Sequence, residues 1–327
     1  MHSDFIKQTQ KYRERLVARI FSYLSAEHPA SLYEPMRYAL QDGGKLLRPI
    51  LAQIICEAVG GDQENVLNAA VALEFVHVFS LVHDDIMDKD DMRRGRATVH
   101  KKWDANAAIL CGDAILIKAY EALGRTTAVH LSQTLAAFNR GILEVCEGQA
   151  LDMEFEDRDD VSLDEYFYMI DRKTARLFSL ACEIGALLGD GSAEQIQGMR
   201  RFGMQLGRAF QIQDDLLDLL ADQTTLGKDV GSDIQKDKKT FLMIHSRQHA
   251  TPEQLDQLLL FVHKNTLSPH EIQHVISILN EIGTIAAAQK QVQDALEKAR
   301  QSLQLLPKSE SHLLLSNLLD MLEHRTY

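Results

Sequence analysis

The sequence has few prolines, few cysteines and few aromatic residues for its 327 positions. It contains 6 prolines, and none lies between Pro49 and Pro252, so nothing in this long middle stretch breaks a helix by lacking an amide hydrogen. Its 4 cysteines are widely spaced and include no Cys-x-x-Cys pair, which argues against a disulfide framework and a zinc site. They are Cys56, Cys111, Cys146 and Cys182. Each has apolar neighbours, so we expect four buried free thiols in a reducing compartment.

Long runs of basic residues are also missing. The formal net charge is -12, so the chain repels nucleic acid and anionic membrane surfaces, and any anionic substrate must be held by a few converging cations and a metal ion. Residues 1–7 lack the charged and apolar regions of a signal peptide, and no apolar run approaches the ~18 residues that span a bilayer. We therefore expect a cytoplasmic protein with no nucleic-acid partner and no transmembrane segment.

Alternating patterns typical of β-strands are absent too. Apolar residues recur instead at spacings of three and four, as at Leu16, Ile20 and Leu24, which is the helical period. Ser162 followed by Glu165 predicts a capping box at a helix start. We predict helices over residues 4–26, 31–41, 46–59, 64–88, 104–124, 127–156, 163–188, 192–222, 237–247, 252–265, 269–303 and 308–325. No linker-like stretch separates them, so the prediction is one all-α domain over residues 1–327, a helical bundle around a central cavity.

Two strings of the form Asp-Asp-x-x-Asp adjoin apolar stretches of the chain. They are Asp84-Asp85-x-x-Asp88 and Asp214-Asp215-x-x-Asp218. In a helix the first and last aspartates share a face, where like charges repel unless a counter-charge is bound. Mg²⁺ supplies such a charge and commonly joins carboxylates to substrate phosphates. The alternative is that an acidic chain forms such strings by chance at solvated helix ends. The apolar surroundings of both strings favour the metal.

Basic residues follow each acidic string. Arg93 and Arg94 come soon after the first string, and Lys228 and Lys238 follow the second. Seen alone, the two arginines would form a solvated turn. Beside carboxylates that hold a metal ion, they can clamp a diphosphate, because a guanidinium group is always charged and binds bidentately.

A glycine pair precedes another basic segment, Gly43-Gly44-Lys45-x-x-Arg48, at a predicted helix start. Glycine lets the backbone approach a ligand closely, and exposed amide groups at a helix start favour an anion. A plain turn between helices is the alternative. His77 lies seven residues before the first acidic string, on nearly the same helical face, where a core histidine with a satisfied hydrogen bond is the simpler interpretation.

Further polar residues interrupt helices that otherwise look buried. They are Gln149, Asp152, Lys173, Thr174 and Gln211. Buried polar groups need hydrogen-bond partners, but this requirement does not identify those partners.

In this order, these motifs resemble the all-trans polyprenyl (isoprenyl) diphosphate synthases, from about Tyr33 to Lys238 and more weakly beyond. The resemblance rests on the segments already quoted together with Gly148-Gln149-x-x-Asp152, Lys173-Thr174, Gln211, Gly227-Lys228 and Gly231-Ser232-Asp233-Ile234. It implies an all-α homodimer that joins isopentenyl diphosphate head-to-tail to an allylic diphosphate. The first acidic string has the short form, without a two-residue insertion.

The resemblance also implies a role for each motif. The ligands of three Mg²⁺ ions would be Asp84, Asp88 and Asp214. Support for the metals and their waters would come from Asp85, Asp152, Asp215 and Asp218. The allylic diphosphate would be neutralised by Arg93, Lys173, Lys228 and Lys238. Isopentenyl diphosphate would bind at Gly44, Lys45, Arg48, His77 and Arg94. The allylic cation would face the carbonyl of Lys173, Thr174 and Gln211.

Product length is predicted from the residues before the first acidic string. Phe79 lies five positions before Asp84, and Ser80 lies one helical turn before it. The bulky Phe79 resembles the block found in short-chain members of the family such as the geranylgeranyl diphosphate synthases, which predicts a product of fifteen to twenty carbons. The alternative is that Phe79 is an ordinary core residue.

Two other functions remain open at this point. A class I terpene cyclase shares the fold and the first acidic string, but it needs no second diphosphate site at Lys45, Arg48 and His77. A non-catalytic regulatory subunit of a prenyl synthase usually loses residues of the acidic strings, whereas both strings are complete here.

Overall fold

The computed structural model describes residues 2–25, 28–41, 44–126, 128–220, 230–264 and 266–324. The chain divides into two compact units, each described by itself below. The first unit comprises residues 1–143, 177–203 and 300–321. The second unit comprises residues 144–176, 204–299 and 322–327. The described residues are almost entirely helical, and the all-α prediction is confirmed.

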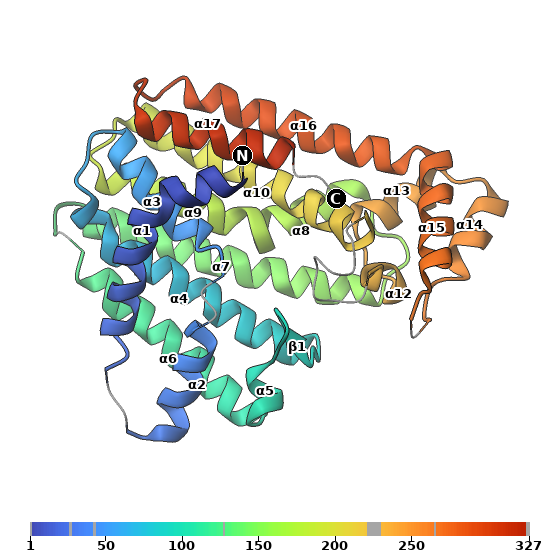
Figure 1. Ribbon diagram of the computed structural model, residues 1–327, viewed down its shortest axis with the longest axis horizontal. Coiled ribbons are helices and arrows are strands. Elements are labelled where there is room, and N and C mark those ends of the chain that lie inside the picture. The colour runs from blue at the N-terminus through green and yellow to red at the C-terminus, as the bar shows by residue number, and fades with distance from the viewer. Residues whose placement is uncertain are drawn as a thin grey trace. The chain divides into compact units, whose positions relative to one another are not determined.

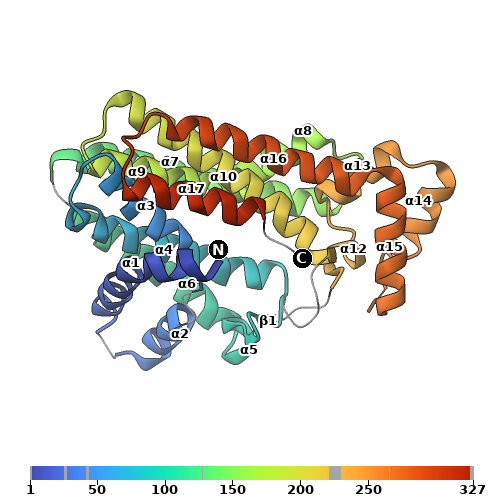
Figure 2. The ribbon, with the colours of Figure 1, turned by 45° about the horizontal axis from the view of Figure 1, so that its top comes forward.

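The first unit is built around α4 (Gln63–Met87), which packs against α3 (Leu47–Ala58) and α6 (Ala105–Gly124). The adjacent positions of α4 and α6 are visible in both ribbon views (Figures 1 and 2). This unit also contains α1 (His2–Ser22), α2 (Ala30–Gln41), α5 (Val99–Lys102) and the first parts of α7 (Leu131–Glu156) and α10 (Ala193–Leu220), together with α9 (Arg176–Leu188) and most of α17 (Glu310–Glu323). A 3-10 turn, Ala128–His130, precedes α7.

Helix α4 begins where the Asp62 side chain accepts a hydrogen bond from the Glu64 amide, and it ends at Asp88. Between these caps the helix is apolar on nearly every face, and by length and composition alone it could cross a membrane. The sequence analysis did not anticipate this property. However, 67% of its most apolar window is buried inside the protein, as in the core helix of a globular domain. The first acidic string therefore lies at the end of a largely buried apolar helix.

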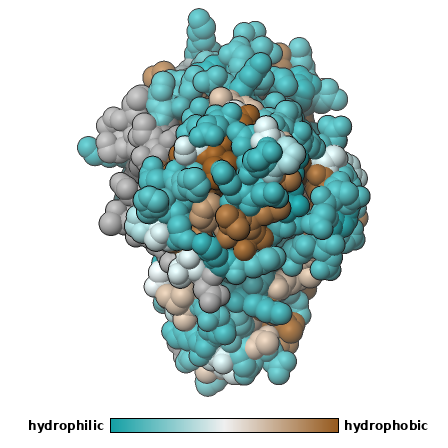
Figure 3. All heavy atoms as spheres, turned by 90° about the vertical axis from the view of Figure 1, so that its right-hand side faces the viewer, coloured by the Kyte–Doolittle hydropathy of each residue, from teal (hydrophilic) through white to brown (hydrophobic). Residues whose placement is uncertain are grey.

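The second unit contains the remaining parts of α7 and α10, with α8 (Leu163–Ile170), α12 (Ser232–Gln235), α13 (Phe241–His249), α14 (Pro252–Leu259), α15 (Pro269–Ile282) and most of α16 (Thr284–Leu303). The predicted capping box of Ser162 and Glu165 is present at the start of α8. Apolar surface is visible on the face of this unit shown in Figure 3. Leu259 and Leu260, at the end of α14, are among its exposed side chains.

Several details differ from the prediction because they depend on tertiary contacts or on single residues. The predicted helix 163–188 contains a π-helical turn at Asp171–Ala175. The predicted helix 269–303 breaks at Gly283, whose φ of 84° caps α15. A two-residue hairpin, β1 (Met92–Arg93) and β2 (Arg96–Ala97), and the short helices α5 and α12 were not predicted. None of the four cysteines, all of which are described, forms a disulfide, but Cys146 is exposed, so its predicted burial was wrong.

Candidate active site

The first acidic string lies at the C-terminal end of α4. Asp85 is only 4% exposed, and its Oδ1 accepts a hydrogen bond from Nε of Arg93 at 2.6 Å. Burial raises the pKa of Asp85, while the Arg93 guanidinium opposes that rise. Asp84 and Asp88 are partly exposed. The string thus divides into an inner carboxylate paired with an arginine and two outer carboxylates on a shared helix face that solvent can reach.

The hairpin after α4 determines where the side chains of Arg93 and Arg94 lie. Met92 pairs with Ala97 and Arg93 with Arg96, so Arg94 and Gly95 form a two-residue turn. Both have positive φ, 51° and 75°, as such turns require. The turn carries the Arg94 guanidinium over Gly44, where an added Cβ would lie 2.4 Å from Nη1 of Arg94. Gly44 therefore has to be glycine for Arg94 to lie across the backbone at this point.

A cationic pocket in the first unit surrounds these groups. Its lining includes Tyr38, Glu74, His77, Asp85, Arg93, Arg94 and Arg96. Nη1 of Arg48 lies 3.3 Å from Nε2 of His77. Because a guanidinium group can only donate, Nε2 accepts, and the ring carries its proton on Nδ1. Burial, followed by the charges of Arg48, Arg94 and Arg93, holds the pKa of His77 well below its usual value. His77 is therefore a neutral polar group among cations.

Glu74 is the unexpected member of this pocket. It is 3% exposed, and burial raises its pKa to about 8 although Arg48, Arg94 and Arg13 oppose the rise. Arg13 also donates from Nη1 to the carbonyl oxygen of Gly44 at 2.8 Å, which ties α1 to the glycine segment. The sequence analysis missed Glu74 and Arg13. A lone acid within the apolar run of α4 could have indicated Glu74, whereas nothing local indicates Arg13.

The second acidic string lies within α10, in the second unit. Asp215 is 4% exposed and accepts hydrogen bonds from three neutral donors. Its Oδ2 accepts from the Tyr166 hydroxyl at 2.6 Å and from the Phe241 amide at 3.3 Å, and its Oδ1 accepts from Nε2 of Gln211 at 2.9 Å. Thr174 in turn donates from its hydroxyl to Oε1 of Gln211 at 2.7 Å. The structure thus joins Thr174, Gln211 and Asp215 through hydrogen bonds, and it adds Tyr166, which the sequence analysis missed.

Asp218 is held by the segment that begins α12. It accepts from Oγ of Ser232 at 2.8 Å and from the Asp233 amide at 3.0 Å. Burial and then the Asp233 carboxylate raise the pKa of Asp218 to about 6, and the same two causes raise that of Asp215 to about 7. Lys238 opposes both shifts. The excess of carboxylate over cation at this place suits a bound positive ion.

Lys173 lies on the π-helical turn and donates from Nζ to Oδ2 of Asp152 on α7. Burial alone would raise the pKa of Asp152, but Lys173 and Lys238 outweigh it and hold that pKa below its usual value. An added Cβ at Gly148 would lie 2.2 Å from the Lys173 amide nitrogen, so α7 approaches the π-helical turn closely here. Such turns are frequent at functional sites. A pocket of the second unit is lined by Asp152, Tyr166, Lys173, Thr174, Gln211, Asp215 and Lys238.

The predicted site residues that the structure describes divide into two groups according to the unit that contains them. The first group contains Gly44, Lys45, Arg48, His77, Phe79, Ser80, Asp84, Asp85, Asp88, Arg93 and Arg94. The second group contains Asp152, Lys173, Thr174, Gln211, Asp214, Asp215, Asp218 and Lys238. Gly43, Gly227 and Lys228 lie outside the described residues. On α4 the Phe79 ring packs edge-on against His83 at 4.9 Å, and Ser80 donates to the carbonyl oxygen of His77 at 2.9 Å.

The residues present fit Mg²⁺ better than a metal enclosed by protein. Within the described ranges, no three His, Cys, Asp or Glu side chains lie close enough together to hold an ion by themselves. The acidic strings instead offer carboxylates at i and i+4, and all ligands are hard oxygen atoms. Mg²⁺ commonly binds one or two carboxylates and completes its coordination with water and substrate phosphate.

Comparison with known proteins identifies the family. The family model described as polyprenyl synthetase matches residues 29–279. A geranylfarnesyl diphosphate synthase from Natronomonas pharaonis is 36% identical, and the match covers 99% of both chains. A crystal structure of geranylgeranyl pyrophosphate synthetase from Pyrococcus horikoshii is 37% identical, with a TM-score of 0.94 over 99% of both chains. A geranylgeranyl pyrophosphate synthase from Corynebacterium glutamicum, complexed with isoprenyl diphosphate and magnesium, is 27% identical, with a TM-score of 0.88 over 96% of this chain and 99% of that one. The chain therefore belongs to the polyprenyl synthetase family and is a prenyltransferase.

Proposed function

We propose that this enzyme joins isopentenyl diphosphate head-to-tail to an allylic diphosphate and makes an all-trans polyprenyl diphosphate of fifteen to twenty carbons. The observation that carries the proposal is the cationic pocket of the first unit, lined by Arg94 and by neutral His77, which Arg48 contacts, in addition to two acidic strings. Two diphosphate substrates need two anion sites of different kinds. A cyclase acting on one diphosphate would have no use for the pocket.

The residue roles follow from the chemistry of the two groups. Isopentenyl diphosphate binds at Gly44, Lys45, Arg48, His77 and Arg94. The allylic diphosphate is neutralised by Arg93, Lys173, Lys228 and Lys238. Three Mg²⁺ ions would be held by Asp84, Asp88 and Asp214, and Asp152 and Asp218 would support the ions and their waters. Bound Mg²⁺ would neutralise the charge that develops on the diphosphate leaving group. The magnesium in the Corynebacterium glutamicum relative supports this part of the proposal.

The reaction needs no side-chain nucleophile. The carbon–oxygen bond of the allylic diphosphate breaks, the double bond of isopentenyl diphosphate forms the new carbon–carbon bond, and the departing diphosphate accepts the proton that is lost. The carbonyl of Lys173, Thr174 and Gln211 face the cation, an electrostatic contribution that is commonly among the largest in catalysis. Apolar helices keep water from the cation. On this proposal both acidic strings bind one allylic diphosphate, so residues 1–327 act as one catalytic domain.

A product of fifteen to twenty carbons is proposed because of the bulk of Phe79 on α4. The Phe79 ring lies edge-on to His83 on the same helix, with the ring centroids 4.9 Å apart. Replacing Phe79 with alanine should lengthen the product, and chromatographic sizing of the products would show it. A product of unchanged length would make Phe79 an ordinary core residue, and a forty-carbon product from the unaltered enzyme would also contradict the proposal.

A homodimer is proposed because α6 and α7 carry an apolar face in the first unit. Its exposed side chains are Ile109, Leu110, Ile117, Tyr120, Leu135 and Leu143. These two helices are neighbours, since the Tyr120 hydroxyl donates to Oδ1 of Asn139 at 2.7 Å. Exposed apolar side chains gathered on neighbouring helices often mark interaction sites, and a second copy of the chain is the partner proposed here. Light scattering should show a dimer that Ile117→Glu disrupts; a monomeric native chain would contradict it.

The decisive assay incubates pure protein with Mg²⁺, labelled isopentenyl diphosphate and each allylic primer in turn. We expect labelled polyprenyl diphosphate and strict dependence on both substrates. Conversion of the allylic diphosphate to hydrocarbon without isopentenyl diphosphate would instead identify a cyclase. No turnover with any primer would favour a regulatory subunit.

A further inference from the structure

The sequence analysis predicted that Asp215, like Asp85 at the same place in the first string, supports a metal ion. The surroundings of Asp215 indicate a different role. Three protein donors already occupy its oxygens: the Tyr166 hydroxyl, the Gln211 amide and the backbone amide of Phe241. A carboxylate offers about four lone-pair positions. With three filled and the side chain 4% exposed, Asp215 is held in place by the protein.

The hydrogen bonds from Asp215 have a fixed direction. In the structure Gln211 turns its NH₂ group toward Oδ1 of Asp215 and its carbonyl oxygen away, which is the arrangement in which the carboxylate only accepts. That carbonyl then accepts the Thr174 hydroxyl hydrogen at 2.7 Å. If the Gln211 amide were reversed, its oxygen would face the carboxylate and its NH₂ group would face the hydroxyl. The hydrogen bonds thus run in one consistent direction along Tyr166, Asp215, Gln211 and Thr174, with Asp215 accepting from both Tyr166 and Gln211.

The consequence appears at Thr174, which lines the pocket of the second unit together with Gln211. Because the Thr174 hydrogen is committed to Gln211, the lone pairs on its oxygen are the part left to face the pocket. An oxygen presented in this way is the negative end of a dipole and stabilises positive charge nearby. Tyr166 also lines this pocket, but it is 1% exposed and its hydroxyl hydrogen is committed to Asp215.

We propose that Tyr166 and Asp215 are positioning residues that orient Gln211 and thereby turn the lone pairs of Thr174 toward the allylic cation. This inference rests on the proposed function, because it needs a cationic intermediate. It separates Asp215 from the aspartates that hold or support metal ions.

The test is Tyr166→Phe, which removes one oxygen atom and keeps the ring. We expect kcat for coupling to fall about tenfold, within the range for lost orientation of a catalytic group. The KM for isopentenyl diphosphate and the Mg²⁺ concentration for half-maximal rate should change less than twofold. Tyr168→Phe is the matched control, because Tyr168 lies two residues along the same helix, is 53% exposed and faces Arg172. It should behave as the native enzyme.

A double-mutant cycle with Thr174→Val separates positioning from general loss of stability. If Tyr166 acts through Thr174, Tyr166→Phe should change kcat less than twofold in the Thr174→Val background, because interacting sites are not additive. An undiminished tenfold effect in that background would overturn the inference, as would a changed Mg²⁺ requirement. So would a Tyr166→Phe enzyme that matches the control.

Asp215→Asn covers the case in which Tyr166→Phe fails to fold. The new amide can present a donor to Gln211, reverse its orientation and engage the lone pairs of Thr174. We expect a larger fall in kcat than for Tyr166→Phe, with the Mg²⁺ requirement unchanged; a shifted requirement would return Asp215 to the metal site. If the native enzyme fails to couple the two substrates, the proposed function itself is wrong. Native coupling with unaffected variants would contradict only this inference.

Discussion

The two acidic strings have the same pattern of aspartates but different electrostatic surroundings. In the first unit the inner aspartate, Asp85, pairs with the charged Arg93. In the second unit the inner aspartate, Asp215, is held by the neutral donors Tyr166, Gln211 and Phe241. Both carboxylates are 4% exposed, so burial does not distinguish them. The difference shows that the sequence pattern specifies which residues gather at a site and leaves their partners undetermined.

The outer aspartates differ in the same way. Asp88 ends α4, and its amide donates to the carbonyl oxygen of Asp84 at 2.8 Å. Asp218 lies inside α10 and is held by Ser232 and Asp233 from a later segment. The outer aspartates of both strings are partly exposed, so the strings differ in the partners of these residues and not in their exposure. The contrast therefore concerns the inner aspartates: Asp85 is paired with a cation, and Asp215 is held by neutral hydrogen-bond donors.

The largest predicted effect is on the pH dependence of stability, and it comes from Glu74, the buried acid beside the arginines of the first unit. The pKa of Glu74 is raised to about 8 from an ordinary value near 4.5, so the folded protein holds a proton that the unfolded chain releases. Its contribution to stability is therefore present at low pH and is lost as pH rises from about 5 to about 8. Relative to Glu74→Gln, the native chain should lose about 3 kcal/mol of unfolding free energy across this range.

Urea unfolding at a series of pH values, without substrate or metal, measures this difference. Subtracting the Glu74→Gln profile removes the contribution of His77 and other titrating groups common to both chains. Glu34→Gln, at an exposed position on α2, should leave the native profile in place. Parallel profiles for the native chain and Glu74→Gln would show that Glu74 is ionised in the folded protein throughout.

Amide substitutions at the two inner aspartates test the comparison directly. Asp85→Asn leaves Arg93 without its carboxylate beside the proposed metal ligands, so kcat/KM for the allylic diphosphate should fall about 100-fold. The Mg²⁺ concentration for half-maximal rate should rise as well. Asp215→Asn should lower kcat without moving the Mg²⁺ requirement. Steady-state rates over a Mg²⁺ titration give both quantities, and an equal shift in the two variants would remove the distinction between the strings.

The sequence analysis predicted those features that depend on residues close together in the sequence. The α4 helix and the capping box at Ser162 follow from local patterns, and the structure contains them. The π-helical turn could not be predicted, because it forms where Gly148 lets α7 approach the backbone of Lys173. Tyr166 was missed for a similar reason: its partner Asp215 lies 49 residues away. A single glycine, Gly283, did give a local sign of the break between α15 and α16.

The smallest predicted effect is on substrate binding, and it comes from Arg13, which connects α1 to the glycine segment. Arg13 donates from Nη1 to the carbonyl oxygen of Gly44 and so fixes the segment that precedes Lys45 and Arg48. Arg13→Gln should raise the KM for isopentenyl diphosphate about tenfold with little change in kcat, because a positioning contact is lost while the reacting groups remain.

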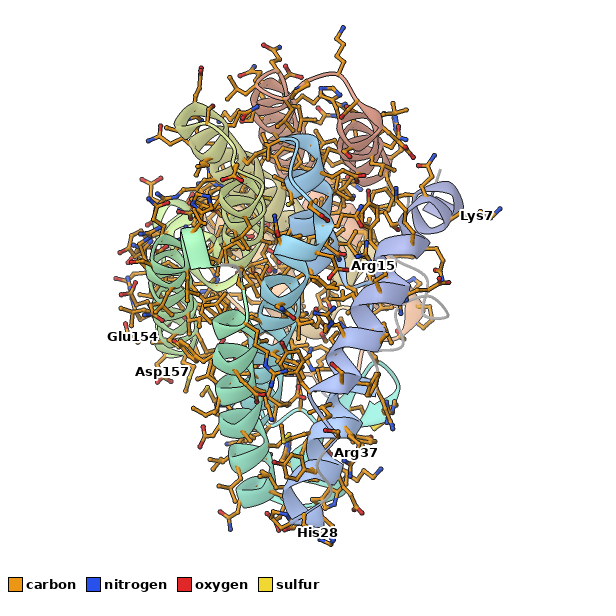
Figure 4. All side chains as sticks on the ribbon, turned by 90° about the vertical axis from the view of Figure 1, so that its left-hand side faces the viewer. Lys7, Arg15, His28, Arg37, Glu154 and Asp157 are labelled. Atoms are coloured by element: carbon orange, nitrogen blue, oxygen red, sulfur yellow. The ribbon has the colours of Figure 1, made fainter. Side chains whose placement is uncertain are left out.

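Arg15→Gln is the matched control for Arg13→Gln. Arg15 lies on the same helix (Figure 4) and contacts Gln63 and Glu64 near the start of α4, away from the glycine segment. Its KM values should stay within twofold of the native ones, because exposed ion pairs contribute little. The KM for the allylic diphosphate should be unchanged in both variants. If Arg13→Gln raised the two KM values equally, α1 would act on the whole enzyme and not on the cationic pocket, and the assignment of that pocket to isopentenyl diphosphate would lose one of its supports.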